Sequence, residues 1–321
     1  MIEVRRGAPR DRPSVRAGSG EPKRAARKAR ARAPRPFTRL SLAGLSRPID
    51  FIGCPELASG FCAILRGWDI TEIAADGGPE PLLGVRRTAR GYRWVPGVLP
   101  MPEDWKSDPP TTLMDAICEL QYEFFEWYLR DNPAHLCLHC AAVEIGGGLV
   151  VVPNPTRAGK STLTVQLAAA GCRVYCDDVL PVEPVRGHGV ALGVLPRLRR
   201  PLAPSLGPRV LQFIAEREGP SNHRYCYVDL GDDELARFGE TAPIRSMVLL
   251  RRVEAAPAAL APVGHGEMLK LVIRRNFADA VPPHDIFGRF HALTGAARRL
   301  QLTYSDPAEA AALLQRELGA R

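Results

Sequence analysis

The sequence predicts an α/β fold, with a mixed sheet, flanking helices and a phosphate-binding loop (P-loop), preceded by a small α+β domain. Residues 150–162 read as a buried strand, a loop and the start of a helix. The helix continues over 161–170, and residues 173–176 form a second strand. That strand ends in Asp177 and Asp178. Acidic residues at the tip of a strand that follows a strand–loop–helix unit are the arrangement a Mg²⁺-nucleotide site needs.

The loop carries the end of the pattern G-x-x-x-x-G-K-[ST] in Gly159, Lys160 and Ser161. Such a loop leaves backbone N–H groups free to hold phosphate oxygens at the positive end of the following helix. The lysine reaches the β- and γ-phosphates, and the serine hydroxyl is a Mg²⁺ ligand. Asn154 replaces the first glycine, and asparagine tolerates a left-handed backbone best after glycine. The candidate nucleotide-binding residues are Asn154, Arg157, Ala158, Gly159, Lys160, Ser161 and Thr162.

The two aspartates have a catalytic and a structural interpretation. Side chains alternate along a strand, so one carboxylate can face the nucleotide and the other a neighbour or the metal. A carboxylate near an attacking hydroxyl would orient it and accept its proton. Alternatively, Asp177 and Asp178 end a strand and begin a turn, where aspartate is common. Lys160 upstream favours the catalytic interpretation.

Residues 139–145, the glycine turn at 146–148, the loop, and the aspartates 17 residues after Lys160 resemble the catalytic domain of HPr kinase/phosphorylase. The stand-alone HPr-kinase-like proteins of bacterial gene clusters look even more similar. The resemblance is sharp over 135–185, diffuse over 110–321, and absent from the first hundred residues.

The resemblance implies ATP and Mg²⁺ as cofactors and a serine kinase as the function. A cytoplasmic location is expected separately, because the N-terminus lacks the apolar core of a secretory signal. Lys160 would hold phosphates, and Ser161 would bind Mg²⁺ with Asp178 as the metal-side neighbour. Asp177 would be the base or positioning residue beside the substrate hydroxyl, and His139 a supporting residue on the strand before the loop.

The sequence departs from this family in two places. Asn154 opens the loop, and residues 193–201 replace the family's acidic, glycine-containing segment. HPr is therefore not the expected substrate, and the resemblance points to a serine of another peptide or small protein, lasso peptide precursors included. A kinase for free serine or a sugar, and a nucleotide sensor without turnover, are the alternatives. The oligomeric state stays open, since HPr kinases form hexamers and stand-alone relatives need not.

Residues 185–209 are rich in glycine, proline and arginine, which predicts a loop near the phosphate site. Arg197, Arg199 and Arg200 are candidates for holding substrate or transition-state charge, because arginine suits phosphate recognition. A charged loop that simply faces solvent is the alternative.

The net charge of +8 is unevenly distributed. Residues 1–40 hold 13 Lys and Arg against 3 Asp and Glu, a net of +10, which leaves −2 for the remainder. Residues 1–36 show no apolar periodicity, so a disordered tail is expected. The tail is either a solvated segment or a tether for nucleic acid, anionic membrane or an acidic peptide. A nucleic-acid protein is the least favoured overall function.

Residues 37–108 form the predicted small α+β domain, with strands at 39–43, 48–52 and 91–95 and a turn at 75–79. A proline-rich connection leads to a helix over 111–130. Apolar side chains recur in it at helical spacing, and we interpret them as core residues. They are Leu113, Ile117, Leu120, Phe124 and Trp127.

Residues 109–321 form the predicted kinase domain. Besides the loop unit, it contains an apolar strand within 135–145 and a later short strand at 301–304. The remaining predicted elements are strands at 225–229 and 244–250, helices at 266–280 and 283–297, and a terminal helix opened by Asp306.

The composition, with 45% hydrophobic residues and a mean hydropathy of −0.12, predicts a globular protein. No apolar run approaches the ~20 residues that span a bilayer, and the N-terminus lacks the apolar core of a secretory signal. The eight cysteines are therefore expected to be reduced. Zinc binding by Cys137, Cys140, Cys172 and Cys176 is the alternative to core thiols, but 137 and 140 fall on a predicted strand instead of a turn.

Overall fold

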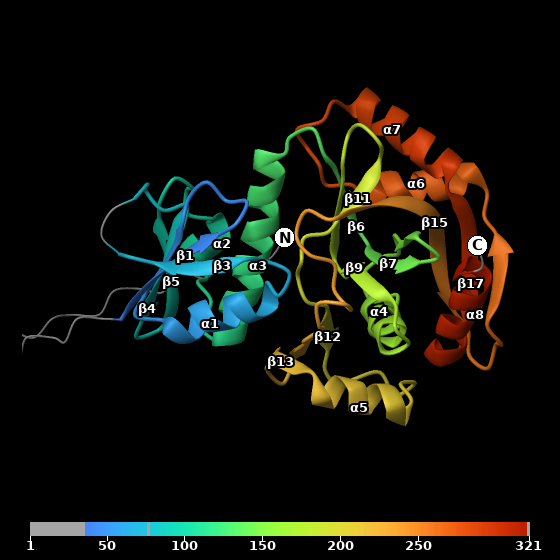
Figure 1. Cartoon of the computed structure of the whole chain (residues 1–321), viewed down its shortest axis with the longest axis horizontal. Coiled ribbons are helices and arrows are strands. Elements are labelled where there is room, and N and C mark those ends of the chain that lie inside the picture. The colour runs from blue at the N-terminus through green and yellow to red at the C-terminus, as the bar shows by residue number, and fades with distance from the viewer. Residues whose placement is uncertain (1–35, 76–77, 320–321) are drawn as a thin grey trace, which may run out of the picture. The chain divides into compact units, whose positions relative to one another are not determined.

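The structure is a computed structural model that describes residues 36–75 and 78–319. The predicted basic tail, apart from Pro36, and the centre of the 75–79 turn lie outside the described residues. The described chain has a mixed α/β architecture with three sheets (Figure 1).

The first sheet has the strand order β3-β1-β2-β4-β5. Its strands are β1 (Phe37–Leu42), β2 (Ile49–Ile52), β3 (Ile70–Ile73), β4 (Leu83–Thr88) and β5 (Gly91–Pro96). Only the β2–β4 pair is parallel among these pairings. Helix α1 (Pro55–Ile64) packs on this sheet. The three predicted strands are confirmed, whereas α1, β3 and β4 were not predicted.

Helix α3 (Leu113–Asp131) links the first sheet to the rest of the chain (Figure 1). It begins at Thr112, whose hydroxyl accepts a hydrogen bond from the Asp115 N–H, and Asn132 ends it. Four of the five predicted core side chains are buried, but Leu113 is 37% exposed because it lies in the first turn. A short helix, α2 (Glu103–Ser107), interrupts the proline-rich connection before it.

The second sheet is the larger one, with the strand order β6-β10-β11-β15-β8-β7-β9. In addition, β17 pairs with β15, and β16 pairs with β17. The pairs of β15 with β8 and with β17 are parallel. Its strands are β6 (Leu136–His139), β7 (Ala141–Ile145), β8 (Gly148–Val152), β9 (Arg173–Cys176), β10 (Val179–Val182), β11 (His188–Val190), β15 (Thr241–Arg252), β16 (Ala259–Pro262) and β17 (Arg298–Tyr304).

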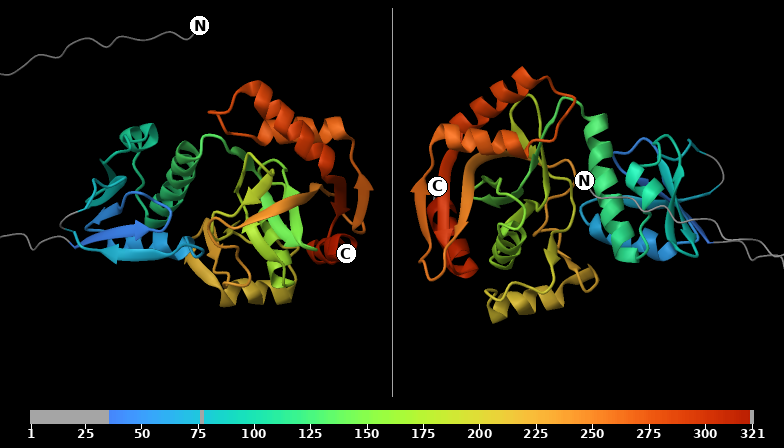
Figure 2. Two further views of the ribbon diagram at one scale, coloured as in Figure 1. Left: turned by 45° about the horizontal axis from the view of Figure 1, so that its top comes forward. Right: turned by 180° about the vertical axis from the view of Figure 1, so that it is seen from behind.

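A third, small sheet has the order β12-β14-β13. Its strands are β12 (Arg197–Arg199), β13 (Glu218–Ser221) and β14 (Tyr225–Val228). The remaining helices are α4 (Lys160–Ala169), α5 (Pro208–Glu216), α6 (His265–Arg275), α7 (Pro283–Ala296) and α8 (Pro307–Gly319). Helices α6 and α7 pack against each other, and α4 packs against α8 (Figure 2).

Three predicted elements differ from the structure. The apolar run at 135–145 forms two strands, because the Cys140 N–H bonds to the Asp178 carbonyl and the chain then turns to pair with β8. His139 therefore ends β6, while β8 directly precedes the loop. Residues 197–199 form strand β12 instead of a loop. Helix α6 ends at 275, because Asn276 and Phe277 pair with β6.

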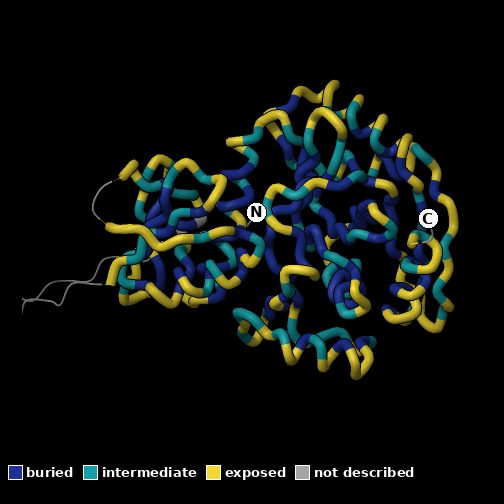
Figure 3. Tube along the Cα trace, viewed as in Figure 1, coloured by how far each residue is buried: buried dark blue, intermediate teal, exposed yellow. Residues whose placement is uncertain are grey.

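The hydrophobic interior runs from the first sheet into the second, as the buried segments of Figure 3 show. The Trp68 ring stacks on Phe238 with 3.7 Å between ring centroids. Its Nε1 donates a hydrogen bond of 2.7 Å to the Leu192 carbonyl. Trp68, which lies between α1 and β3, thereby fixes the position of Leu192. The chain continues from Leu192 into β12.

Candidate functional site

The loop between β8 and α4 turns through two left-handed residues, Arg157 (φ 69°) and Gly159 (φ 95°). Asn154 is not among the residues with positive φ in the described chain, so the left-handed backbone that asparagine tolerates is not used at this position. Its buried side chain instead makes two hydrogen bonds to Leu250 in β15. Asn154 Nδ2 donates to the Leu250 carbonyl (3.0 Å), and the Leu250 N–H donates to Asn154 Oδ1 (2.8 Å). The amide therefore fastens the start of the loop to the central strand.

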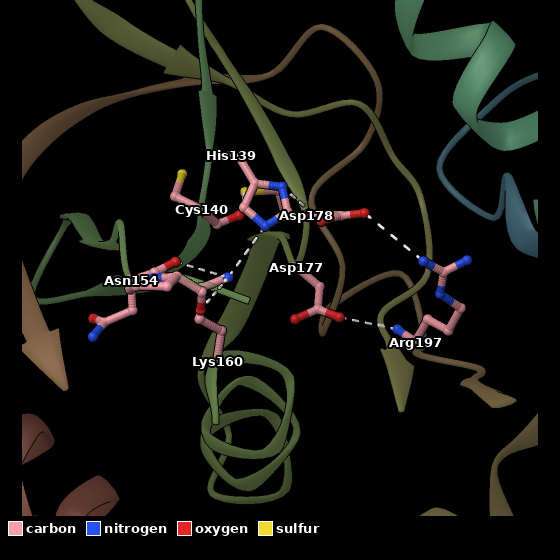
Figure 4. A network of polar contacts seen from close by, with 9 residues as sticks. His139, Cys140, Asn154, Lys160, Asp177, Asp178 and Arg197 are labelled. Carbon is pink, nitrogen blue, oxygen red and sulfur yellow. Dashed lines mark hydrogen bonds and ion pairs between the residues drawn. The ribbon is translucent and has the colours of Figure 1, made fainter. Parts of the chain in front are cut away.

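Lys160 begins α4 and is 7% exposed. Its Nζ donates to the carbonyls of Asn154 (2.9 Å) and Pro155 (3.3 Å) and lies 3.3 Å from His139 Nε2 (Figure 4). Burial lowers the pKa of Lys160, while the carboxylates of Asp177 and Asp178 oppose that change. The ammonium is thus held by neutral acceptors at the mouth of the loop.

His139 connects Lys160 to Asp178, since its Nδ1 lies 3.1 Å from Asp178 Oδ1. Burial lowers the pKa of His139, Asp178 opposes this, and the charge of Lys160 adds to it. The neutral ring satisfies both contacts when Nδ1 carries the proton and donates to Asp178, while Nε2 accepts from Lys160.

Asp177 lies beside the same residue, Arg197, that Asp178 contacts (Figure 4). Its Oδ2 accepts a hydrogen bond of 3.1 Å from the Arg197 N–H. Its Oδ1 is buried and has no hydrogen-bond partner among the described residues. Burial and then the charge of Asp178 raise the pKa of Asp177 to about 6, whereas the neighbouring Ser161 hydroxyl lowers it. The Ser161 hydroxyl therefore lies close to the Asp177 carboxylate.

Of the three candidate arginines, Arg197 is the most closely involved. Its Nη2 lies 3.9 Å from Asp178 Oδ2 (Figure 4). Its guanidinium lies over the Tyr225 ring, 5.0 Å from the ring centroid. Arg199 is exposed at the cavity wall. Arg200 is instead paired with Glu218 at 2.6 Å.

Most of the side chains described above line one cavity of about 500 Å³. The predicted residues that line it are His139, Arg157, Gly159, Lys160, Ser161, Thr162, Asp177, Asp178, Arg197 and Arg199. Asn154, Ala158 and Arg200 are not among its lining residues. The sequence reasoning did not identify Arg252, at the end of β15, or Gln121 and Tyr225 as lining residues. Only Arg252 had a local signal, as a basic residue directly after a predicted strand.

The oxygen-bearing side chains of the cavity determine whether it could hold a metal ion. The described residues contain no group of three or more His, Cys, Asp or Glu that could hold a metal ion. Mg²⁺, however, commonly takes one or two protein oxygens together with substrate phosphates and water. The Ser161 hydroxyl and the unpartnered Oδ1 of Asp177 are oxygen ligands of that kind.

The cysteines considered for zinc, Cys137, Cys140, Cys172 and Cys176, are buried free thiols. Burial raises the pKa values of Cys137 and Cys176 well above the usual range for a thiol.

Within the described residues, no helix is long and apolar enough to cross a membrane.

Comparison with known proteins gives little further information. No family model matches the chain, and no curated protein matches it. Among solved structures, the HPr(Ser) kinase/phosphatase from Coxiella burnetii is similar at 12% identity, over 56% of this chain and 95% of that chain. The TM-score of 0.26 is too low for this likeness to bear on function.

Proposed function

We propose that this protein is an ATP- and Mg²⁺-dependent kinase that transfers the γ-phosphoryl group to a hydroxyl, namely a serine of a peptide or small protein. One observation carries the proposal. A continuous set of contacts runs from Lys160 through His139, Asp178 and Arg197 to Asp177, around a cavity at the N-terminus of α4.

The loop side of this cavity suits the nucleotide phosphates. The first N–H groups of a helix have no acceptor within the helix, and they carry partial positive charge. In α4 these groups belong to Lys160, Ser161 and Thr162, directly after the left-handed Gly159. The Lys160 ammonium would exchange its loop carbonyls for phosphate oxygens, which are stronger acceptors because they are charged.

Ser161 and Asp177 would hold Mg²⁺. This assignment exchanges the roles expected for the two aspartates, because Asp177 is the carboxylate beside Ser161. Mg²⁺ bound there would neutralise charge on the β- and γ-phosphates. The metal would also stabilise the ionised form of Asp177, so the pKa raised by burial would fall on binding.

Asp178 would orient the acceptor hydroxyl and accept its proton. His139 fixes the position of this carboxylate through the 3.1 Å contact. The acceptor oxygen forms a bond to the γ-phosphorus, the bond from that phosphorus to the β,γ-bridging oxygen breaks, and ADP leaves. Arg197 is close enough to Asp178 (3.9 Å) to stabilise charge that develops on the transferred group.

Titration calorimetry with Mg-ATP tests the proposal, with wild type compared with Lys160→Ala. We expect micromolar binding that is lost in the variant. The Arg200→Ala variant is a matched control, because this cation is outside the cavity lining and should leave binding unchanged. Folded wild-type protein that does not bind Mg-ATP would overturn the assignment. Binding without ADP formation in the presence of any acceptor would support the nucleotide-sensor alternative.

A further inference from the structure

A second cavity of about 330 Å³ adjoins the first. His139, Asp178 and Arg197 line both cavities. The loop residues line only the first, whereas Cys118, Tyr122, Glu126 and Phe277 line only the second. The proposed proton acceptor therefore lies in the wall that the two spaces share.

We propose that the phosphoryl acceptor enters through this second cavity and is a serine-bearing peptide segment with an apolar and a basic side chain beside the serine. The inference rests on the proposed kinase function and names its acceptor class. Phosphoryl transfer needs the attacking and leaving oxygens roughly in line. An acceptor that reached the γ-phosphorus from the loop side would meet the leaving group, so it must approach from elsewhere.

One face of α3 forms the wall of the second cavity. Cys118, Gln121, Tyr122, Phe125 and Glu126 follow the three- and four-residue spacing that places helical side chains on one face. Phe125 is 7% exposed and Tyr122 is 59% exposed. The face therefore runs from the buried interior to solvent, as an entry for a chain segment requires.

Part of the cavity wall is apolar, and hydrogen bonds hold this part of the wall in place. Phe277 lies in the segment that pairs with β6, and its N–H donates to the Cys137 carbonyl (3.1 Å). Gln121 is buried and accepts a hydrogen bond from the Tyr227 hydroxyl. Phe125, Phe277 and Val179 can therefore contact an apolar side chain without rearrangement of the wall.

The charge of the cavity indicates the second feature of the acceptor. Glu126 is half-buried at the wall, and no hydrogen bond or ion pair in the described part of the chain engages its carboxylate. The other acidic group, Asp178, already faces His139 and Arg197. A basic side chain on the acceptor would pair with Glu126 while its serine hydroxyl reaches Asp178. In the transfer, that hydroxyl loses its proton to Asp178 as its oxygen bonds to phosphorus and ADP departs.

The test uses the full chain, labelled Mg-ATP and short blocked peptides in which serine is flanked by Leu or Phe and by Arg, Ala or Glu. Wild type is compared with Glu126→Lys and with Glu254→Lys, an exposed glutamate outside both cavities. We expect wild type and Glu254→Lys to prefer the Arg peptides over the Glu peptides by about tenfold, since like charges across an interface are strongly disfavoured. The Glu126→Lys variant should invert this preference and keep the wild-type affinity for Mg-ATP.

A second variant, Tyr122→Ala, checks the apolar contact at the cavity entrance. It should raise KM several-fold for the Phe peptides and leave kcat unchanged, because Tyr122 does not line the nucleotide cavity.

The outcomes separate the two proposals. Phosphorylation whose flanking preference is the same in wild type and Glu126→Lys would overturn the acceptor site and leave the kinase assignment standing. Mg-ATP binding with transfer to free serine or a sugar, but to none of the peptides, would also overturn it. Failure of wild type to bind Mg-ATP would instead overturn the proposed function itself.

Discussion

Two aspartates in this protein are withdrawn from solvent in opposite ways. Asp50, in β2 of the first sheet, is 6% exposed, and both of its oxygens bond to Arg39, at 2.7 and 2.8 Å. Asp177, at the end of β9, has one buried oxygen without a partner among the described residues, and burial raises its pKa to about 6. A bidentate arginine satisfies a buried carboxylate, whereas an unsatisfied one is costly.

The difference indicates what each region does. The first sheet uses its buried charge to fix the pairing of β1 with β2, where Arg39 and Asp50 are opposite each other. In the loop region, burial lowers the pKa of Lys160 and raises the pKa of Asp177, so both changes favour the neutral side chain. Strongly shifted groups in a cavity are typical of functional sites. Substitution of Asp178, Asp50 and Asp177 distinguishes structural from functional charge.

The largest effect is expected for Asp178→Asn. Loss of the proton acceptor should lower the rate of phosphoryl transfer by about 10²–10⁴-fold, while the half-exposed position leaves the melting temperature nearly unchanged. Single-turnover transfer and thermal unfolding measure the two quantities. A variant that retains the wild-type rate would show that Asp178 is not the proton acceptor.

The opposite pattern is expected for Asp50→Ala. Removal of one partner of a buried ion pair is strongly destabilising, so the free energy of unfolding should fall by about 3–5 kcal/mol. Mg-ATP affinity of the folded protein should stay the same. Denaturant unfolding provides the measurement, and the double variant Arg39→Met/Asp50→Leu should recover much of the loss. A decrease below 1 kcal/mol in the single variant would contradict the structural role of this pair.

Asp177→Asn should abolish the dependence of ATP affinity on Mg²⁺ and should also stabilise the folded protein. The pKa of Asp177 is higher in the folded protein than in the unfolded chain. As the pH rises from about 4 to about 6, the unfolded chain therefore loses this proton first, and the folded state becomes less stable. Above about pH 6 the loss of stability is constant. The gain at pH 7.5 should reach at most about 3 kcal/mol, since one pKa unit corresponds to about 1.4 kcal/mol. Unfolding of both proteins at pH 4 and pH 7.5 measures it. A gain that is equal at both pH values would show that charge is not the cause.

The smallest effect is expected for Asn154→Gly, which restores the consensus residue of the loop. The Leu250 N–H and carbonyl would lose their partners, and a buried unsatisfied group costs about 1–3 kcal/mol. Stability should therefore fall, and Mg-ATP affinity should not improve. Asn154→Asp is the matched comparison, because it keeps only the acceptor oxygen. A glycine variant as stable as wild type would mean that the amide bridge contributes nothing.

Local patterns predicted the elements whose signals are contained in one segment. The strand that leads into the loop, the helix that ends before Gly171 and the strand at 173–176 have such signals. The break at Cys140, the early end of α6 and strand β12 depend on partners far along the chain, so local periodicity could not predict them.

The sequence by itself determined that a phosphate-loop pattern precedes two acidic residues at a strand end. Tertiary structure decided the rest of the candidate site: that the Ser161 hydroxyl lies close to Asp177, that His139 contacts both Lys160 and Asp178, and that an α3 face borders a second cavity. It also gave Asn154 its role, through bonds to a strand 96 residues later in the chain. Backbone turns and periodicity are local properties, whereas burial, charge pairing and shared cavities arise only when distant segments pack together.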